Sequence, residues 1–243
     1  MSREALAAGG LGGGVGLAVA VAGTLAWAAL SPGSQLFGRT LIAPKRPDEI
    51  ALTFDDGPNP AATPALLEVL ERAGVRATFF VIGRYVEDCA GLLREIRAAG
   101  HLVGNHTMMH PWLAWQPEQR IREEISGASA AIEDVLGERV RYFRAPHGAR
   151  RPVVLRVARE MGMVPVQWNV ICQDWKPLGA EGILQQAVRG VERNRRRGVG
   201  TNAVLHDGGQ WGLGAPRMDT VRAVEKLVER YRGMKFVGVD AWG

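Results

Sequence analysis

Short apolar runs alternate with segments of helical hydrophobic spacing along most of the chain. The first apolar run, at 50–54, ends in a turn signal and predicts a buried strand. Leu66, Leu67 and Leu70 then recur at helical spacing before Gly74. The same alternation predicts strands at 77–82, 101–105, 142–143, 164–169, 202–205 and 236–239, and helices around 92–100 and at 119–136, 152–161, 183–196 and 220–231. This gives seven strands with helices between them.

Alternation of this kind predicts an α/β fold whose strands are parallel and are joined by helices. An open doubly wound sheet and a closed barrel both fit the pattern. Polar, reactive residues follow strand after strand along the chain. In a barrel those strand ends converge on one face, whereas in an open sheet they would be strung along an edge. The distribution of reactive residues therefore favours a barrel.

The composition is that of an ordinary globular protein, with 243 residues, 47% hydrophobic and 23% charged. About 200–250 residues suit a single α/β barrel, so we expect one catalytic domain with a short appendage. The net charge of +5 includes Arg193, Arg195, Arg196 and Arg197. We interpret this cluster as a solvated helix end in preference to a site for anionic lipid or wall polymer. No basic and aromatic pattern indicates nucleic acid, and two cysteines form no disulfide framework.

Residues 5–30 contain no charged side chain, and a bilayer core of about 30 Å needs about 20 apolar helical residues. The segment therefore predicts an apolar N-terminal helix that serves as an uncleaved membrane anchor, although its glycine and alanine weaken the hydrophobicity. A secretory signal peptide, cleaved near small residues such as Ala26 or Ala28, is the alternative. Residues 31–47 carry proline, glycine and basic residues and predict a linker.

We divide the chain into residues 1–38, which hold the anchor or signal peptide and the start of the linker, and residues 39–243, which form the catalytic domain. Arg39, Lys45 and Arg46 follow the apolar segment, and the positive-inside tendency would hold that side in the cytoplasm. The chemistry described below argues instead for a catalytic domain outside the cytoplasm, either membrane-anchored or secreted after cleavage. The sequence leaves the oligomeric state open.

Five clusters of reactive residues stand at the ends of predicted strands. His106 and His110 are four residues apart, so on a helical turn both rings would face one metal ion. Asp55 and Asp56 are the obvious sources of a third ligand. Neighbouring residues of an extended chain point in opposite directions, so we expect one to bind metal and the other to act as a base. The clusters are Thr-Phe-Asp-Asp-Gly-Pro at 53–58, His-Thr-Met-Met-His at 106–110, Arg-Ala-Pro-His-Gly at 144–148, Trp-Asn at 168–169 with Asp-Trp at 174–175, and Leu-His-Asp-Gly at 205–208.

The order of these clusters resembles that of the polysaccharide deacetylases, which include nodulation-type chitooligosaccharide deacetylases and their peptidoglycan, chitin and xylan relatives. The resemblance covers about residues 50–239. It implies a distorted (β/α) barrel with about seven parallel strands. It also implies a hydrolase that removes N-acetyl groups from an amino-sugar polymer or oligosaccharide. Each cluster alone has an ordinary explanation, such as a turn or a surface ion pair, but five of them at strand ends favour chemistry.

The resemblance assigns a metal site and a base to residues that match its motifs. Asp56, His106 and His110 would hold a divalent metal, with Zn²⁺ first and Co²⁺, Ni²⁺ or Mn²⁺ as alternatives. Asp55 would be the general base, and Arg144 would orient it and pair with its charge.

The resemblance also assigns an acid and a substrate pocket. His206 would be the general acid, oriented by Asp174. Trp175 and Leu205 would wall the pocket for the acetyl methyl group, and the backbone N–H of His147 would help to bind the oxyanion. The family often has Tyr or Trp at the position of His147, which a backbone role tolerates. The expected substrate-binding residues are Pro146, His147, Trp175 and Leu205.

Three other functions are compatible with parts of this pattern. The first is a deacylase of a lipid-linked sugar or of an O-acetylated polysaccharide such as xylan. The second is a non-catalytic carbohydrate-binding module, which the presence of base, acid and metal ligands disfavours. The third is a non-haem iron oxygenase, since two histidines and one carboxylate also suit iron.

Overall fold

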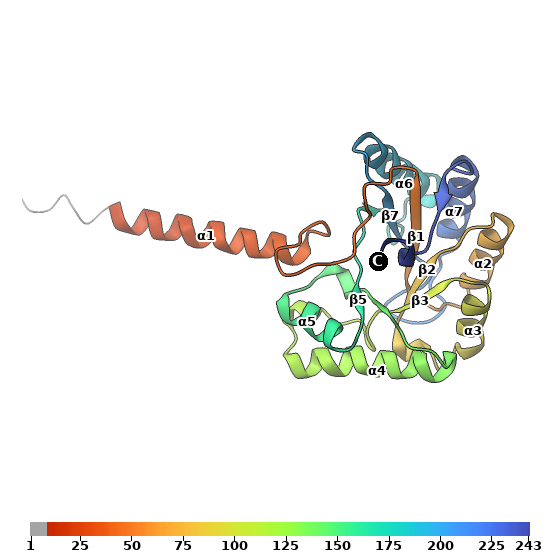
Figure 1. Cartoon of the computed structure of the whole chain (residues 1–243), viewed down its shortest axis with the longest axis horizontal. Helices are drawn as coiled ribbons and strands as arrows, with labels where there is room; N and C mark the ends of the chain where they lie inside the picture. Colours follow the sequence, from red (N-terminus) through yellow and green to blue (C-terminus); the bar gives the residue numbers. More distant parts are fainter. Residues whose placement is uncertain (1–8) are drawn as a thin grey trace, which may run out of the picture.

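The alternating strands and helices form a curled sheet with helices on its outer side (Figure 1). The computed structural model describes residues 9–243, and the side chains of the first helix from residue 19 onward. The described strand pairings are all parallel, in the order β5-β4-β3-β2-β1-β7-β6, with β8 paired to β1. The strands are β1 (Glu49–Gly57), β2 (Thr78–Val81), β3 (Leu102–Asn105), β4 (Tyr142–Phe143), β5 (Val164–Pro165), β6 (Val170–Ile171), β7 (Thr201–His206) and β8 (Lys235–Phe236). The α-helices are α1 (Gly9–Leu30), α2 (Thr63–Arg72), α3 (Ala90–Ala98), α4 (Glu118–Leu136), α5 (Pro152–Glu160), α6 (Gly179–Arg196) and α7 (Met218–Arg230). The parallel α/β architecture expected from the sequence is confirmed.

The strand predicted at 164–169 is wrong beyond Pro165: the chain forms only the short strand β5 there, and the short strand β6 follows at 170–171 on the opposite edge of the sheet. β5 pairs with β4 at one edge, and β6 pairs with β7 at the other. Between β5 and β6 the chain crosses the open side of the barrel. Hydrogen bonds from side chains there take the place of some main-chain bonds between strands. Asn169 Oδ1 accepts the Asn202 N–H at 2.9 Å, and Asn202 Nδ2 donates to the Gln167 carbonyl at 3.0 Å. The barrel is therefore distorted and half open.

Alternation along β1 separates a helix-facing core from the barrel interior. Ile50, Leu52 and Phe54 pack with the helices in the main hydrophobic core. Ala51 belongs to a smaller apolar cluster inside the barrel, which includes Phe80. The next interior positions after Ala51 are Thr53 and Asp55, so polar groups occupy the interior toward the ends of the strands.

The last predicted strand, at 236–239, is shorter than expected. β8 ends at Phe236 and is followed by the short 3₁₀ helix η4 (Val239–Trp242). Trp242 Nε1 donates a hydrogen bond of 2.8 Å to Glu49 Oε2 at the start of β1. The end of the chain therefore packs against the beginning of the barrel, away from the polar strand ends.

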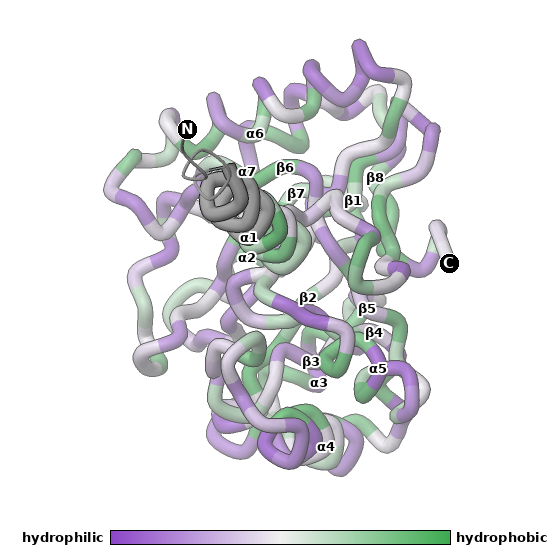
Figure 2. Tube along the Cα trace, turned by 90° about the vertical axis from the view of Figure 1, so that its left-hand side faces the viewer, coloured by the Kyte–Doolittle hydropathy of each residue, from purple (hydrophilic) through white to green (hydrophobic). Residues whose placement is uncertain are grey.

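Helix α1 projects from the barrel, and its C-terminal end lies against it (Figures 1 and 2). Among the residues that the structure describes, no helix is both long and apolar enough to cross a membrane. The anchor predicted for residues 5–30 is therefore not supported, and residues 5–8 lie outside the described part.

Arg150 fixes the end of α1 to the barrel. Its side chain is 1% exposed and donates hydrogen bonds of 2.8 Å and 2.9 Å to the carbonyls of Ser31 and Ser34. It also donates to the carbonyl of Gly148 at 3.0 Å. A cation stabilises the free carbonyls at a helix C-terminus. By bonding carbonyls on both sides, Arg150 joins the segment after α1 to the loop at Gly148.

Candidate active site

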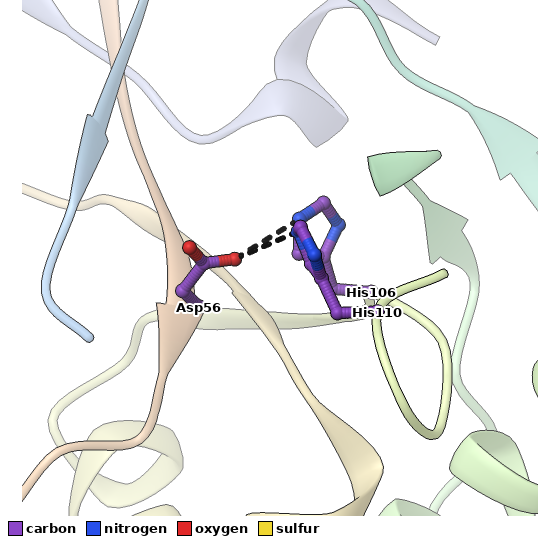
Figure 3. Close-up of side chains that lie close together, drawn as sticks. All are labelled: Asp56, His106 and His110. Carbon is purple, nitrogen blue, oxygen red and sulfur yellow. Dashed lines mark ion pairs between the residues drawn. The ribbon is translucent and has the colours of Figure 1, made fainter. Parts of the chain in front are cut away.

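Three buried side chains converge at the ends of β1 and β3 (Figure 3). Asp56 Oδ1 lies 3.1 Å from His110 Nε2 and 3.4 Å from His106 Nε2. One potential ligand atom from each residue lies within 4.8 Å of the other two. The structure thus brings together the three residues expected to bind metal.

A bulge in β1 turns Asp56 toward the histidines. The register of β1 against β2 shifts between Asp55 and Gly57, and Asp56 has a left-handed backbone conformation with φ of +69°. The expectation that neighbouring carboxylates point in opposite directions is wrong here, because it assumed an extended chain. His106 Nε2 lies 3.4 Å from Asp56 and 3.8 Å from Asp55 Oδ2, so both acids face the same imidazole.

His106 and His110 lie in a loop, and the helical turn expected for them is wrong. Thr107 and His110 both have left-handed conformations, with φ of +69° and +59°. The His110 N–H donates to the Thr107 hydroxyl at 3.0 Å, and the Thr107 N–H donates to Asn105 Oδ1 at 2.8 Å. These bonds hold the loop in the shape that directs both rings at Asp56.

The hydrogen-bonding state of this cluster fits a bound cation. His106 Nδ1 lies 2.8 Å from the Arg144 carbonyl oxygen, which can only accept, so Nδ1 carries the ring proton. Nε2 is then the nitrogen that is free to bind a cation held by the Asp56 carboxylate. Asp56 Oδ1 and His110 Nδ1 have no hydrogen-bond partner among the described residues. Two imidazole nitrogens and one carboxylate form a donor set typical of zinc and related divalent metals.

The ionisation of Asp56 agrees with a ligand role. Burial by itself would raise the pKa of Asp56, but the imidazoles of His106 and His110 hold this pKa well below its usual value. The carboxyl group is therefore present as an anion.

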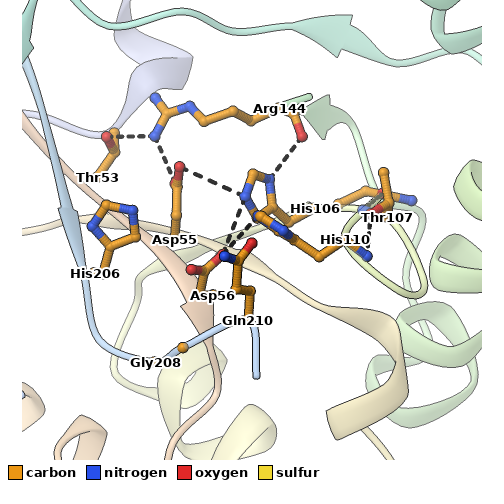
Figure 4. A network of polar contacts seen from close by, with 12 residues as sticks. Thr53, Asp55, Asp56, His106, Thr107, His110, Arg144, His206, Gly208 and Gln210 are labelled. Atoms are coloured by element: carbon orange, nitrogen blue, oxygen red, sulfur yellow. Dashed lines mark hydrogen bonds and ion pairs between the residues drawn. The ribbon is translucent and has the colours of Figure 1, made fainter. Parts of the chain in front are cut away.

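Asp55 lies next to this cluster and is held by Arg144 (Figure 4). Arg144 Nη1 donates to Asp55 Oδ1 at 2.8 Å and to the Thr53 hydroxyl at 2.8 Å. Arg144 is fully buried, with its guanidinium carbon 4.2 Å from the centre of the Phe80 ring. Burial lowers the pKa of Arg144 and Asp55 opposes that effect. The Asp55–Arg144 pair expected from the sequence is present.

His206 lies on the other side of Asp55 (Figure 4), where it pairs with Asp174. His206 Nδ1 lies 2.7 Å from Asp174 Oδ1, and the His206 N–H donates to Asp174 Oδ2 at 2.7 Å. Burial alone would lower the pKa of His206, but Asp174 and the two acids of β1 raise it to about 9. The imidazole is therefore protonated at neutral pH, with Nδ1 bound to Asp174.

A cleft of about 1080 Å³ opens above these groups and contains some of the expected substrate-binding residues. Trp175 and His147 line it, and the Trp175 ring meets the His206 ring edge-on at 5.3 Å. Leu205 does not line it. Because His206 faces the interior, Leu205 faces the helices and packs in the main core, while Val204 lines the cleft. Pro146 is buried and does not line the cleft; it starts the 3₁₀ helix η3 (Pro146–Gly148), directly before His147.

His147 lines the cleft, and its ring is held by Trp112 and His110. Its ring stacks on Trp112 with centroids 4.0 Å apart and meets the His110 ring edge-on at 4.7 Å. Burial, assisted by the neighbouring histidines, lowers the pKa of His147 to about 4. The His147 ring is therefore neutral and stacked. Trp112 belongs to none of the sequence motifs, so its contact with His147 was not predicted.

Asp207 is a buried carboxyl group for which no role was predicted. Its Oδ2 accepts a hydrogen bond from Thr63 and its carbonyl accepts one from Asn59. Burial raises the pKa of Asp207 to about 7. The next residue, Gly208, packs so closely that a Cβ there would overlap the carbonyl group of Asp56. These contacts hold the end of β7 against the bulge at Asp56.

Residues 43–166, half of the chain, match the family described as polysaccharide deacetylase. A chitooligosaccharide deacetylase from Azorhizobium caulinodans is 32% identical over 208 residues, which make up 83% of this chain and 96% of that protein. The chain belongs to the polysaccharide deacetylase family. The resemblance identified from the motifs is thereby confirmed.

Other relatives of this polysaccharide deacetylase agree with that assignment. The peptidoglycan-N-acetylglucosamine deacetylase PgdA of Listeria monocytogenes is 35% identical over 191 residues, 79% of this chain and 38% of that protein. The crystal structure of the Bc1960 peptidoglycan N-acetylglucosamine deacetylase matches with a TM-score of 0.74 and 29% identity, covering 82% of this chain and 90% of that one. The chain is thus a hydrolase of the deacetylase class with the barrel of its family, and the expectation of an enzyme is confirmed.

Proposed function

We propose that this enzyme removes N-acetyl groups from an amino-sugar polymer or oligosaccharide of the peptidoglycan or chitin type. The observation that carries the proposal is the arrangement around Asp55. The cluster of Asp56, His106 and His110 lies on one side of it and the protonated His206 on the other. An acetamide in the cleft would meet a metal site, a base and an acid together. The names of the relatives supply the substrate class.

Asp56, His106 and His110 would hold the divalent cation, with zinc the first choice for this donor set. A bound divalent cation lowers the pKa of its water to about 7 and polarises a carbonyl oxygen. The Arg144 carbonyl keeps His106 in the tautomer whose Nε2 can bind the cation.

Asp55 acts as the general base and accepts the proton of the attacking water. Its Oδ1 is occupied by Arg144, which leaves Oδ2, the oxygen 3.8 Å from His106 Nε2, directed at the metal cluster. Arg144 pairs with the charge of Asp55 and fixes the direction of its carboxylate. A buried base fixed in this way needs no reorganisation before it takes the proton.

His206 acts as the general acid. Its Nδ1 is bound to Asp174, so Nε2 is the nitrogen that donates a proton to the leaving amine as the carbon–nitrogen bond breaks. Acetate and a free amino sugar are the products. Thr220 Oγ1 donates to Asp174 Oδ2 at 2.9 Å and fixes the carboxylate that orients His206.

Trp175 provides an apolar wall beside His206 for the acetyl methyl group. The His147 N–H has no acceptor among the described residues and is available to bind the oxyanion. We place the domain outside the cytoplasm, where wall polymers are found. This is tested by whether added protease digests the chain in intact cells.

The test is release of acetate from purified peptidoglycan, chitooligosaccharides and acetylxylan, with and without a chelator. We expect acetate from one or both amino-sugar substrates, loss of activity with chelator, and recovery with Zn²⁺. Release of acetate from acetylxylan alone would show that the enzyme removes O-acetyl groups and not N-acetyl groups. A protein that binds metal but releases no acetate from any substrate would be a carbohydrate-binding module.

A further inference from the structure

A second hollow adjoins the catalytic cleft. It has a volume of about 480 Å³ and shares Trp168 and Ile171 with the lining of the cleft. It lies between α6, β6 and the segment after α1, which contributes Pro32 and Gly33. A chain-like substrate that leaves the cleft past Trp168 would enter this groove.

A glycine in the middle of α6 allows the groove to form. A Cβ at Gly190 would overlap the side chain of Val170, so β6 can approach the helix only because this residue is glycine. A glycine inside a helix costs about 1 kcal/mol relative to alanine. Arg189 and Arg193, on the same helix as Gly190, lie at the rim of the groove.

The rim is positively charged and has no opposing acid. Arg189 and Arg193 lie one helical turn apart, and both are exposed. Arg193 Nη2 donates to the Asn169 carbonyl at 2.9 Å, which steadies its guanidinium over the groove. Among the described residues, no aspartate or glutamate lines the groove, and neither arginine forms an ion pair. The neutral polar residues of the lining are Asn169, Gln173 and Gln186.

We propose that this groove binds a carboxylate carried by the glycan chain whose acetyl group occupies the catalytic cleft. Arginine guanidinium groups bind carboxylates through paired hydrogen bonds, and the amide side chains add neutral donors. Chitin chains are uncharged, whereas the alternate sugars of peptidoglycan strands carry lactyl groups whose carboxylates are free wherever the stem peptide has been removed. The groove therefore selects the anionic glycan, an assignment that rests on the proposed deacetylase function.

The test compares two double variants of the full-length, metal-loaded protein. Arg189→Gln with Arg193→Gln removes the rim charges. Arg195→Gln with Arg196→Gln removes the same charge from the same helix end outside the groove. The substrates are a chitooligosaccharide, glycan strands with free lactyl carboxylates, and the same strands with those carboxylates amidated.

We expect wild-type kcat/KM to be roughly fivefold to tenfold higher for the carboxylate strands than for the amidated strands, as two exposed ion pairs would give. The groove variant should lose this ratio, the control should keep it, and added salt should reduce it because exposed charges are screened. An unchanged ratio in the groove variant, or an equal loss on all three substrates, would overturn the proposal.

Binding separates this proposal from the deacetylase function on which it rests. Affinity for the carboxylate and amidated strands is measured by calorimetry on Asp55→Asn protein with and without the two groove substitutions. If no strand is deacetylated by wild type, the proposed function fails, and the affinity ratio still decides the groove. A ratio near one in both proteins overturns the groove proposal even where deacetylation is robust.

Discussion

His106 Nδ1 lies 2.8 Å from the main-chain carbonyl oxygen of Arg144, while the Arg144 side chain donates to Asp55 at 2.8 Å. One residue thus orients a metal ligand through its backbone and the proposed base through its guanidinium. The two contacts fix the direction of His106 Nε2 relative to Asp55. Arg144 therefore couples the positions of the proposed base and the proposed metal site. A substitution of the Arg144 side chain would remove the contact with Asp55 and leave the main-chain contact with His106.

Changing Asp55→Asn should abolish turnover without removing the metal. Asparagine keeps the shape of the side chain and an oxygen that accepts from Arg144, but it cannot take a proton. A general base contributes roughly 100-fold to 10,000-fold, so kcat should fall by that factor while bound metal, measured by elemental analysis, stays near one equivalent. Retention of more than a tenth of wild-type kcat would show that another group is the base.

Changing His110→Ala is the matched test of the metal site. It removes one of three ligands, so metal content itself should fall together with activity. Excess Zn²⁺ should restore activity in part here and not at all in Asp55→Asn. Full metal occupancy in the His110 variant would contradict its role as a ligand.

The pH profile should report His206 on its alkaline side. Its pKa is raised to about 9 because Asp174 stabilises the imidazolium, so kcat/KM should decline above about that pH. In Asp174→Asn the stabilising charge is lost, the proton leaves more readily, and the decline should move toward the ordinary histidine value of about 6.5. The exposed Asp134→Asn variant is the control, and an alkaline limit unaffected by Asp174→Asn would remove His206 as the acid.

Much of the fold could be predicted because each helix and most strands have clear hydrophobic periodicity. α4 begins within one residue of its predicted start and ends at Leu136 as predicted. The break between β5 and β6 could not be predicted, because an apolar run says nothing about which neighbour it pairs with. Hydrogen bonds from the side chains of Asn169 and Asn202 take the place of main-chain bonds here. They join segments that are far apart in the sequence, so local patterns do not reveal them.

The site was predictable in composition and less so in backbone geometry. Motif order identified Asp56, His106 and His110, but the bulge at Asp56 and the loop at His110 depend on left-handed conformations that the residue types do not announce. Leu205 illustrates the opposite case. Strand alternation places it away from His206, so the signal for its position was present in the sequence.

Changing Gly208→Ala should disturb Asp56 from the end of the neighbouring strand β7. The added methyl group would overlap the main chain of Asp56, and backbone atoms cannot give way as a flexible side chain could. We expect a loss of roughly 1–3 kcal/mol of unfolding free energy and weaker metal binding by titration. Gly212→Ala, where a Cβ meets nothing within 4 Å, should change neither.

Replacing Arg150→Met should destabilise the barrel through the segment after α1. It removes hydrogen bonds to the carbonyls of Gly148, Ser31 and Ser34, and bonds to a charged donor contribute about 1.5–3 kcal/mol each before desolvation is counted. We expect a net loss of about 2–4 kcal/mol by urea denaturation, against less than about 0.5 kcal/mol for the exposed Arg139→Met. Equal stabilities of these variants would show that the segment after α1 does not support the barrel.

His101 should make the protein sensitive to mild acid independently of the active site. The ring is 2% exposed, and its Nδ1 accepts the Ala77 N–H at 3.2 Å where the chain enters β2. Burial lowers the pKa of His101 from 6.5 to about 4. The unfolded chain therefore takes up a proton as the pH falls through 6.5, and the folded chain does not until about 4. The stability due to this residue is complete above pH 6.5 and is lost as the pH falls toward 4.

His101→Asn, which keeps an acceptor but does not titrate, should show a smaller drop in Tm between pH 7 and pH 5 than wild type, by a few degrees. Parallel Tm curves for the two proteins would mean that the ring is already free to protonate in the fold.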